Sequence, residues 1–491
     1  MLSDRGQPAA REAIWADDQV AFKARAEFAA NGLLRKSPHL SAGAPLPGWQ
    51  KSTIAATAVL LPVAMLFVFI GHGGLMAVCL AIPFALIVAI RTAALWQLVV
   101  PRVSRRSQLP HLATHDLPRY SVLVPLFREA AIAPALVHAL KALDYPRDRL
   151  EILFITEASD AATRAALIAA QLPSHMRVLT VPAGLPQTKP RALNYALATA
   201  IGDFVAVFDA EDVPEPSQLR RAVQMFAQSG PELVCVQARL KACETEGRLL
   251  PRQFALEYAA LFEAILPALE RLGLPIPLGG TSNHFRRSGL IEVGAWDAYN
   301  VTEDADLGVR LVRSGKHVAM LDSETLEDAP ASAHAWLGQR TRWLKGWMQT
   351  YLVHMRDPGQ LLADLGLWRF FGVQALLGGM ILSALVHPWF YVAVFIKLSL
   401  GHPVLPEAGG LWALCCFNLA AGYAVGIMLG LIVAQRSNGR IALVSALLVP
   451  VYWLAISAAS YRALIDLRRR PFYWEKTPHV AREVTAAPSS P

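Results

Sequence analysis

The sequence predicts an α/β domain with a mostly parallel sheet, combined with an all-α transmembrane region of about six helices. Between residues 101 and 365, short runs rich in Val, Ile and Leu alternate with helical stretches rich in Ala and Leu, which is typical of βαβ units. Long apolar stretches flank this region, several near the ~20 residues that a membrane-spanning helix needs. The chain thus divides into an N-terminal segment (1–50), two membrane helices (51–100), the α/β domain with an interfacial helix (101–365), about four membrane helices (366–462) and a C-terminal tail (463–491).

Four apolar runs are the expected strands of the α/β domain. They are Tyr120–Leu126, Leu150–Ile155, Arg177–Val181 and Phe204–Phe208. A polar turn and a helical stretch follow each run, as a crossover between parallel strands requires. Open parallel sheets bind ligands at the carboxyl ends of their strands. The acids that follow three of these runs, Glu129, Glu157 and Asp209, are therefore candidate ligand-binding residues.

Six apolar stretches are the expected membrane helices. They are Thr53–Ile70, Leu75–Val99, Trp368–Leu385, Trp389–Leu400, Leu411–Ala434 and Ile441–Ala459, with His387-Pro388 as the break between the third and fourth. Six spans place both termini and the α/β domain on one side, and the basic groups Arg102–Arg106 and Arg468–Arg470 mark this side as cytoplasmic. Arg436 and Arg440 then fall in an outer loop. Three C-terminal spans would avoid this but would export Arg468–Arg470.

Composition narrows the classes of protein to which the chain can belong. Apolar residues make up 54% and charged residues 17% of the 491 residues, which disfavours a purely soluble protein. The net charge is +8, but the basic residues form no single stripe with aromatic residues, so no nucleic-acid partner is expected. The five cysteines form no CxxC pair and are interpreted as buried apolar side chains. Residues 1–50 lack a cleavable signal, with a helix expected at Ala21–Leu34 and a linker at Gly43–Gly48.

Asp209 and Glu211 form the candidate metal site. They are one residue apart in the turn after a predicted strand, so both carboxylates can reach one ion in a cleft. Mg²⁺ and Mn²⁺ prefer oxygen ligands and keep phosphate oxygens of a substrate as further ligands. The alternative is an acidic turn that prepares the helix expected after Glu215-Pro216-Ser217.

Lys189 and Asp304 are candidates for handling charge during a reaction. Lys189 lies in a loop before a predicted helix, where a lysine can meet a diphosphate as a point charge. Its alternative is a solvated surface lysine. Asp304, in Thr302-Glu303-Asp304, can accept the proton of an attacking hydroxyl. The same motif equally suits a helix start, with Thr302 as N-cap and acids in the first turn, and both interpretations can hold together.

Gln339, Arg342 and Trp343 have helical spacing, with Gln339 and Arg342 on one face. Arg342 can neutralise a leaving diphosphate, and Trp343 can stack on the apolar face of a sugar. The alternative is an amphipathic helix along the membrane, because Trp336, Trp343 and Trp347 are typical interfacial anchors. One helix can fill both roles.

A glycine-rich turn at Gly279-Gly280 is followed by several hydrogen-bonding side chains. They are Thr281, Ser282, Asn283 and His284. No helix is evident directly after this turn, so it is interpreted as an acceptor loop rather than a phosphate-binding loop. Its alternative is a plain loop into a strand, and a histidine such as His284 is by itself more often structural than catalytic.

In their order along the chain, these motifs resemble those of membrane-embedded family 2 glycosyltransferases, the group that includes bacterial cellulose synthase and related β-glycan synthases. The family pattern is a nucleotide-binding acid, a DxD, a TED and a Q(Q/R)xxRW, and the similarity covers about residues 115–350 with the flanking spans. It implies a GT-A-like catalytic domain on the cytoplasmic side of the inner (plasma) membrane. The implied activity is inverting transfer of a hexose from a nucleotide sugar, UDP-glucose or similar, to a growing β-linked polysaccharide, with export through the spans and a periplasmic export partner.

Carried over position by position, the resemblance assigns roles to the motifs. Glu157 or Asp160 contacts the uracil, because Ile155-Thr156-Glu157-Ala158-Ser159-Asp160 replaces the usual Asp-Asp-Gly. Asp209 and Glu211 bind Mg²⁺ or Mn²⁺ with the diphosphate, although Glu replaces the second Asp of the DxD. Asp304 is the general base, and Gln339, Arg342 and Trp343 secure the diphosphate and the glycan end. Gln339-Arg340-Thr341-Arg342-Trp343 is one residue shorter than the family spacing.

Three other functions fit parts of the sequence. Transfer of one sugar to a lipid carrier is the alternative within the enzyme class, but the Arg342-Trp343 pair and four trailing spans favour polymer synthesis. A membrane transporter is disfavoured by the long βαβ-like region with acids at its strand ends. A non-catalytic scaffold is disfavoured because Asp304 and Arg342 are both present.

Overall fold

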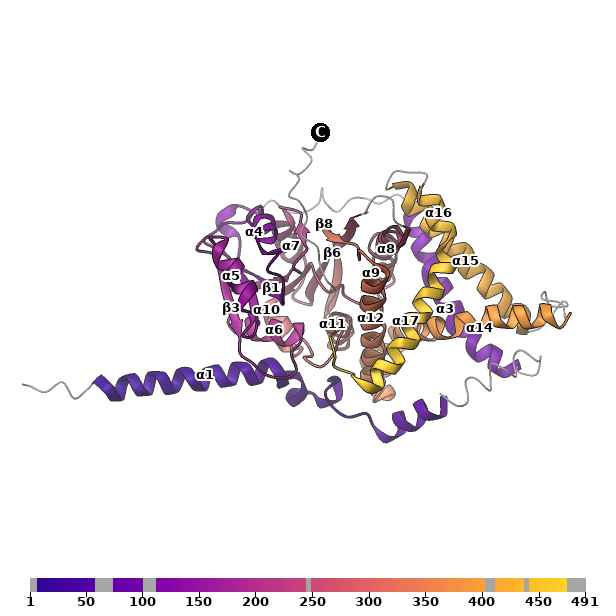
Figure 1. Cartoon of the computed structure of the whole chain (residues 1–491), viewed down its shortest axis with the longest axis horizontal. Coiled ribbons are helices and arrows are strands. Elements are labelled where there is room, and N and C mark those ends of the chain that lie inside the picture. Colours follow the sequence, from indigo (N-terminus) through magenta and orange to yellow (C-terminus); the bar gives the residue numbers. More distant parts are fainter. Residues whose placement is uncertain are drawn as a thin grey trace, which may run out of the picture.

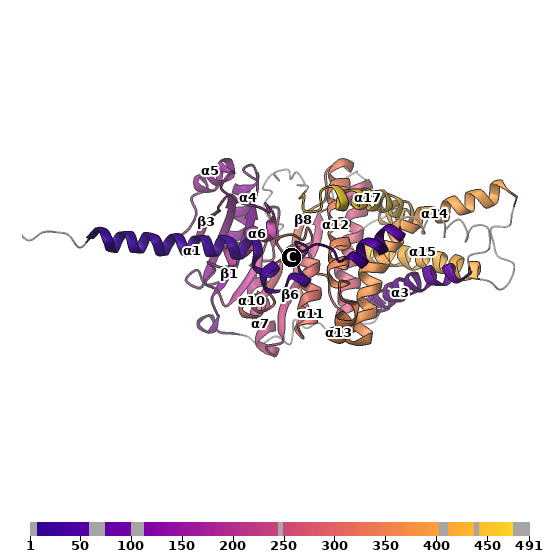
Figure 2. The same cartoon turned by 90° about the horizontal axis from the view of Figure 1, so that it is seen from below.

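The structure is a computed structural model that describes residues 7–57, 74–99, 112–243, 249–401, 411–436 and 441–474. An α/β domain occupies the centre of the molecule, and long apolar helices pack against one side of it (Figure 1). The N-terminal helix α1 (Gln7–Lys36) extends away from the opposite side in both views (Figures 1 and 2). The predicted α/β class is confirmed for the central domain.

One eight-stranded sheet, ordered β3-β2-β1-β4-β7-β6-β8-β5, forms the centre of the α/β domain. Its strands are β1 (Tyr120–Leu126), β2 (Leu150–Glu157), β3 (Met176–Val181), β4 (Phe204–Val207), β5 (Val213–Pro214), β6 (Leu233–Cys243), β7 (Asn283–Arg286) and β8 (His317–Asp328). Strands β3, β2, β1 and β4 are parallel, as predicted. However, β7 is antiparallel to β4 and β6, and β5 is antiparallel to β8, so the sheet is mixed. The chain returns from β6 to the sheet at the end where β6 finished, and β7 therefore runs in the reverse direction.

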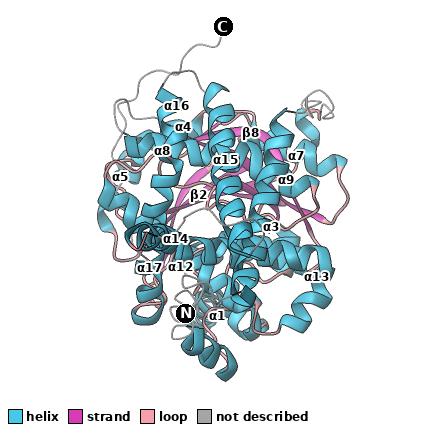
Figure 3. Cartoon of the chain, turned by 90° about the vertical axis from the view of Figure 1, so that its right-hand side faces the viewer, coloured by secondary structure: helices cyan, strands magenta, loops and turns pink. Residues whose placement is uncertain are grey.

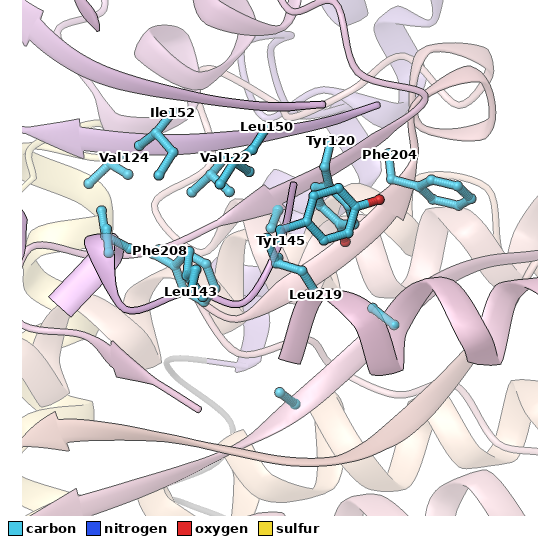
Figure 4. Packing of buried hydrophobic residues seen from close by; sticks show 14 of the residues in the cluster. Tyr120, Val122, Val124, Leu143, Tyr145, Leu150, Ile152, Phe204, Phe208 and Leu219 are labelled. Atoms are coloured by element: carbon cyan, nitrogen blue, oxygen red, sulfur yellow. The ribbon is translucent and has the colours of Figure 1, made fainter. Parts of the chain in front are cut away.

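Helices cover both faces of the sheet. They are α4 (Ala133–Lys141), α5 (Ala161–Ala169) and α7 (Gln218–Gln228) on one face, and α6 (Lys189–Leu197), α10 (Arg287–Glu292) and α11 (Glu303–Arg313) on the other. Along β1, Val122 and Val124 pack in the first cluster and Leu123 in the second, as the alternation of a pleated strand requires. Figure 4 shows the first cluster, in which Tyr120, Tyr145 and Phe204 pack closely.

A layer of helices lies between the sheet and the long apolar helices. It contains α8 (Leu249–Ala259), a π-helical turn (Ala260–Ile265), α9 (Leu266–Arg271) and α12 (Ala333–His354). The predicted helix with Gln339, Arg342 and Trp343 is therefore present as α12. Its Trp336 packs against Tyr452 of α17 (Val449–Arg469), so α12 connects the domain to this helix.

Three helices among the described residues are long and apolar enough to cross a membrane. Their apolar stretches are Ala81–Val99, Pro358–Ser399 and Cys416–Gln435. The first lies in α3 (Gly74–Val99), the second runs through α13 (Pro358–Val373), a π-helical turn (Gln374–Gly379) and α14 (Met380–Ser399), and the third lies in α15 (Leu411–Arg436). Figure 3, viewed from this side, shows these helices in front of the sheet. Most of the expected span Thr53–Ile70, and Arg102–Arg106, lie outside the described residues.

Two details of the predicted spans are wrong. Helix α14 continues through Pro388, so His387-Pro388 does not separate two helices. A proline removes one backbone donor, and packing against neighbouring helices lets an apolar helix tolerate it. Conversely, Ile441–Ala459 is not one helix, because α16 (Ile441–Leu447) ends before Leu448 and α17 starts anew. Pro450 lies in the first turn of α17, where its fixed φ and missing donor favour a helix start.

The N-terminal arm, residues 37–50, lies against the α/β domain instead of forming the expected linker. Arg356, just after α12, donates to the carbonyl oxygens of Pro38 and Ser41 at 2.9 and 2.8 Å. Gln50 donates to the carbonyl of Leu352 at 2.8 Å. The predicted helix at Ala21–Leu34 is present within α1.

Candidate active site

Lys189, Asp209 and Asp304 meet at Gly280. Lys189 is the first residue of α6, Asp209 follows β4, and Asp304 lies in the first turn of α11. Lys189 Nζ is 2.5 Å from Asp209 Oδ1 and donates to the Gly280 carbonyl at 2.7 Å. A Cβ at Gly280 would lie 3.2 Å from Asp304 Oδ2, 3.6 Å from Lys189 Nζ and 3.9 Å from Asp209 Oδ2. The three charged groups therefore face one position, which we call the reaction centre.

Acidic side chains crowd together beside Asp209. Asp212 Oδ2 accepts from the Asp209 backbone N–H at 2.6 Å and also from the Thr281 hydroxyl. Burial raises the pKa of Glu211 well above its usual value, and the charges of Asp209, Asp212 and Glu327 add to this. Burial and the Asp209 charge likewise raise the pKa of Asp212 to about 8. Repulsion between these carboxylates disfavours their ionised forms unless a cation is bound.

The donor atoms at Asp209 and Glu211 fit a hard divalent cation. Both supply carboxylate oxygens, and positive charge there would offset the repulsion that raises the pKa of Glu211. In the part of the chain that the structure describes, no group of three or more His, Cys, Asp or Glu side chains surrounds one point. Mg²⁺ is commonly held by one or two carboxylates together with substrate phosphates. Asp209 and Glu211 are thus the residues that could hold Mg²⁺ or Mn²⁺.

Glu327 is a member of this acidic group that the sequence motifs missed. It lies near the end of β8 and is 7% exposed. Burial, followed by the charges of Asp212 and Asp209, raises its pKa well above the usual value, and Tyr258 donates to it at 3.4 Å. The sequence does contain a signal for this burial. Alternate residues of a strand share one face, and Glu327 lies on the same face of β8 as the buried Ser323 and Thr325.

Asp304 is half-buried at the start of a helix. Burial raises its pKa, against a 2.7 Å hydrogen bond from the Ala305 N–H and the charges of Lys189 and Arg342. Burial and the Asp304 charge raise the pKa of Glu303 to about 8. The predicted helix start is present, since α11 begins at Glu303, but the Thr302 side chain makes no capping hydrogen bond. Asp304 is therefore a half-buried acid whose ionised form is favoured by the charges of Lys189 and Arg342.

Glu129, Glu157 and Asp160 lie at the carboxyl ends of β1 and β2, where we expected the nucleobase. Asp160 caps α5, accepting from the backbone N–H groups of Thr163 at 3.2 Å and Arg128 at 2.5 Å. The Glu157 carboxylate is 3.6 Å from Arg191 Nη1. Burial raises the pKa of Glu157 to about 7, and Arg191 opposes this shift.

The geometry therefore favours Glu157 over Asp160 as a base-contacting acid, because Asp160 already holds two backbone donors. Glu129 is 7% exposed at the same edge, and its backbone N–H donates to Thr163 Oγ1 at 2.9 Å. Arg191, the partner of Glu157, was missed from sequence because its type and position in α6 indicate an ordinary helix residue.

Arg342 faces the reaction centre from α12. Its charge acts on both Glu303 and Asp304, and its guanidinium carbon lies 4.5 Å from the ring centre of Trp474. Gln339, one helical turn earlier, is 7% exposed. Trp474 belongs to the C-terminal segment, Arg470–Trp474, which follows α17 and returns to α12. This segment was not predicted to contribute to the site.

Trp343 belongs to a group of stacked aromatic rings. Its ring centre is 6.0 Å from that of Tyr258 and 6.1 Å from that of Phe254, both in α8. The Arg340 guanidinium lies 4.7 Å from the Trp343 ring and pairs with Glu257 at 2.5 Å. Trp343 is thus fixed by a cation and two rings before any ligand binds.

Half of the expected acceptor loop lies inside the sheet, because Asn283 and His284 belong to β7. Thr281 and Ser282 follow the two glycines in the turn before β7, and Gly280 lies at the reaction centre. His284 in β7 is fully buried and bonds Tyr120 OH at 2.7 Å and Gln218 Oε1 at 3.1 Å. Ser282 and Asn283 are also buried, bonding Thr325 and the Gly279 carbonyl. Burial thus removes Ser282, Asn283 and His284 from an acceptor surface, and lowers the pKa of His284 to about 3.

The fold and the site together define an enzyme of the glycosyltransferase class with a GT-A fold. Residues 118–346 match the family model described as "Glycosyltransferase like family 2". This range contains β1 to β8, Lys189, Asp209, Asp304 and Arg342. This part of the chain is therefore similar to family 2 glycosyltransferases, and the sequence-based expectation of a glycosyltransferase is confirmed.

Two curated relatives agree with this class, and one solved structure shares the fold. A probable glycosyltransferase, YdaM, of Bacillus subtilis is 24% identical over 74% of this chain and 87% of its own length. A β-monoglucosyldiacylglycerol synthase of Synechocystis is 31% identical over 55% of this chain and 58% of its own length. The mannosyltransferase PcManGT of Pyrobaculum calidifontis, solved with GDP-Man and Mn²⁺, aligns with a TM-score of 0.52 and 18% identity over 79% of this chain and 99% of its own. The last similarity shows the fold alone.

Proposed function

We propose that this glycosyltransferase moves a sugar, with inversion, from a nucleotide-sugar donor to a growing β-linked glycan at a membrane. The observation that carries the proposal is the meeting of Lys189, Asp209 and Asp304 at Gly280. At this position, Lys189 offers a cation for the diphosphate. Asp209 offers a carboxylate for a metal, and Asp304 offers a carboxylate for the proton of the acceptor hydroxyl. An in-line displacement at a sugar carbon needs these three functions together.

On the donor side, Lys189 is placed to bind the diphosphate. Its ammonium group is anchored by Asp209 and Gly280, so it is oriented before the donor arrives. Mg²⁺ or Mn²⁺ held by Asp209 and Glu211 would supply further positive charge to the diphosphate. Glu157 and Glu129, at the neighbouring strand ends, are placed for the nucleobase, as in UDP-glucose or a similar donor.

On the acceptor side, Asp304 is the proposed general base. A carboxylate with a raised pKa is a stronger base, so burial favours proton uptake by Asp304. The acceptor oxygen forms a bond to the anomeric carbon while the bond from that carbon to the diphosphate breaks. The proton of the acceptor hydroxyl goes to Asp304, and Lys189 and Arg342 stabilise the leaving diphosphate.

The aromatic group at Trp343 supports a glycan as acceptor. Pyranose rings present apolar faces, which fit against Trp343, and Gln339 lies one turn away on the same helix. Aromatic residues continue from α12 to α17, which packs against α14, because Trp336 donates to Tyr452 OH at 2.9 Å. A chain that leaves the reaction centre therefore meets aromatic side chains in the direction of the bilayer.

Transfer of a single sugar to a lipid is the second candidate. It is favoured by the similarity to β-monoglucosyldiacylglycerol synthase and by the apolar helices that pack against α12. In both cases the three apolar helices support a multi-pass membrane protein. The basic residues Arg468–Arg470 favour a cytoplasmic α/β domain at the inner membrane. A periplasmic export partner belongs to the glycan proposal alone.

Radiolabelled donors distinguish these functions. The purified protein in detergent is incubated with Mg²⁺ or Mn²⁺ and a panel of labelled nucleotide sugars, beside Asp304→Asn and a chelator control. Label in an immobile polymer, lost in both controls, is the expected result. Label found only in organic-extractable material would replace the glycan proposal by the lipid alternative. Transfer that persists in Asp304→Asn would contradict the proposed base.

A further inference from the structure

The loop Trp296–Thr302, which leads into Asp304, contacts the N-terminal arm. Asp297 accepts from the Ser41 hydroxyl at 2.9 Å and the Ala42 N–H at 2.6 Å. The same carboxylate accepts from the N–H of Tyr299 at 3.2 Å. One buried acid thus binds the arm and the loop to each other.

Tyr299 is the residue of this loop that contacts α1, the N-terminal arm and the C-terminal segment. Its hydroxyl donates to Asn31 Oδ1 in α1 at 2.9 Å. A Cβ at Gly43 would lie only 2.6 Å from its ring, so the absence of a side chain at Gly43 lets the arm approach this closely. On the other side, the ring meets Phe472 edge-on, with centres 5.3 Å apart.

The segments on either side of Tyr299 are themselves fixed. Lys345 donates to the carbonyls of Arg470 and Tyr473 at 3.2 and 2.7 Å, which holds the C-terminal segment on α12. Gln349 donates to the Pro471 carbonyl at 3.1 Å and accepts from the Val301 N–H at 3.2 Å. One α12 side chain therefore joins the C-terminal segment to the loop that carries Tyr299.

The loop also reaches the donor side. Thr188, directly before Lys189, donates to the Ala298 carbonyl at 2.8 Å. At the other end of the loop, a Cβ at Gly346 would overlap Thr302. The backbone of α12 at Gly346 therefore packs directly against Thr302. A displacement of Tyr299 would therefore move Asp304 relative to both Lys189 and α12.

We propose that Tyr299 is a positioning residue for the transfer reaction, clamped between the N-terminal arm and Phe472 so that Asp304 keeps its place at Gly280. The inference rests on the proposed role of Asp304 as general base. It gives a role to the N-terminal arm, which precedes one group of apolar residues, and to the C-terminal segment, which follows α17. The N-terminal arm and the C-terminal segment then both influence the position of Asp304 through Tyr299.

Kinetics of Tyr299→Ala, Tyr299→Phe and Phe472→Ala test this proposal in the full-length protein. Tyr299→Ala should lower the kcat of transfer about tenfold or more, because a displacement of the order of 1 Å in a reactive group has large effects on rate. Tyr299→Phe keeps both ring contacts and loses only the bond to Asn31, so its kcat should lie between those of Tyr299→Ala and the wild type. Phe472→Ala should lower kcat in the same direction without altering the loop itself. The Kd for the nucleoside diphosphate should stay within about twofold in all three.

The control is Phe22→Ala, which removes an edge-on contact with Tyr195 from α1 but does not touch Tyr299. It should keep the wild-type kcat, and thermal unfolding identifies any variant that fails to fold. If Asp304→Asn is inactive while Tyr299→Ala and Phe472→Ala both keep wild-type kcat, the positioning role is wrong and the proposed base stands. If Asp304→Asn remains active, the proposed function itself fails.

Discussion

The donor side and the acceptor side of the site are built by different means. The donor side takes Lys189 from the start of α6 and Asp209 from the turn after β4, and the acceptor acid Asp304 lies beside them at the start of α11. The acceptor side takes its rings from α8, α12 and the C-terminal segment, which are far apart in the sequence. A charged residue at the end of a strand or helix is positioned by the local sequence. A group of aromatic rings from distant segments forms only after these segments have packed together.

The two sides also differ in how charge is compensated. At the donor side, burial, followed by repulsion between neighbouring carboxylates, raises the pKa of Glu211, Asp212 and Glu327. At the acceptor side, Arg340 is matched by Glu257 and by the Trp343 ring. The donor side therefore has excess negative charge that a cation can neutralise, whereas the charge of Arg340 on the acceptor side is already paired. Four predictions test this difference.

The largest effect is expected for Asp304→Asn. An amide cannot accept the acceptor proton, and general-base catalysis typically contributes 10²–10⁴-fold, so kcat should fall by about three orders of magnitude. Steady-state kinetics with a labelled donor measure the change. Asp148→Asn, at an exposed carboxylate, is the matched control and should behave as the wild type. If kcat falls by less than about tenfold in Asp304→Asn, Asp304 is not the general base.

Lys189→Gln should have the next largest effect. It removes a preorganised charge from the developing diphosphate, a type of loss that costs roughly 10²–10³-fold in kcat. It also leaves Asp209 without its 2.5 Å partner, so repulsion within the acidic group increases. Calorimetry should show weaker binding of nucleoside diphosphate. Unchanged affinity together with unchanged kcat would place the diphosphate elsewhere.

A substitution on the acceptor side should change acceptor binding without changing donor binding. Trp343→Ala should raise the acceptor KM about tenfold, since an aromatic contact contributes about 0.5–1.5 kcal/mol beyond its burial. The donor KM should not change, because Trp343 makes its contacts with Tyr258, Phe254 and Arg340. Trp347→Ala, on the same helix, is the control. Equal changes in both KM values would show that the two sides are not independent.

The smallest expected effect concerns the pH dependence of donor binding. Burial raises the pKa of Glu157 to about 7, so this carboxyl is ionised above that pH and protonated below it. The ionised form accepts an N–H of the nucleobase more strongly, so donor affinity should fall a few-fold as pH drops from about 8 to 6. Glu157→Gln should abolish this dependence. A pH profile that is the same in wild type and Glu157→Gln would argue against contact with the base.

Much of the donor side could be predicted because strand ends and helix starts are encoded locally. β1 has the predicted bounds, and Asp209 and Lys189 follow from the apolar runs and turns beside them. The antiparallel β7 could not be predicted, because its direction depends on where the chain returns from α9. His284 was misplaced for the same reason, since a short β7 places it in the core.

Contacts made by distant segments left no local signal in the sequence. Arg191, which pairs with Glu157, and Trp474, which packs on Arg342, give no functional signal in the sequence before the chain folds. The docking of the N-terminal arm also depends on Arg356, more than 300 residues away, which bonds three backbone carbonyls of the arm at 2.6–2.9 Å. The break at Leu448 and the continuity through Pro388 likewise depend on how neighbouring helices pack.

The most direct test of the account is the stereochemistry of transfer. The purified protein is supplied with an α-linked nucleotide sugar and Mn²⁺, and the anomeric configuration of the new linkage is read by NMR from the product. One displacement at the reaction centre, with Asp304 deprotonating the acceptor, predicts a β-linkage. An α-linked product would contradict single displacement and the assignment of Asp304 as its base.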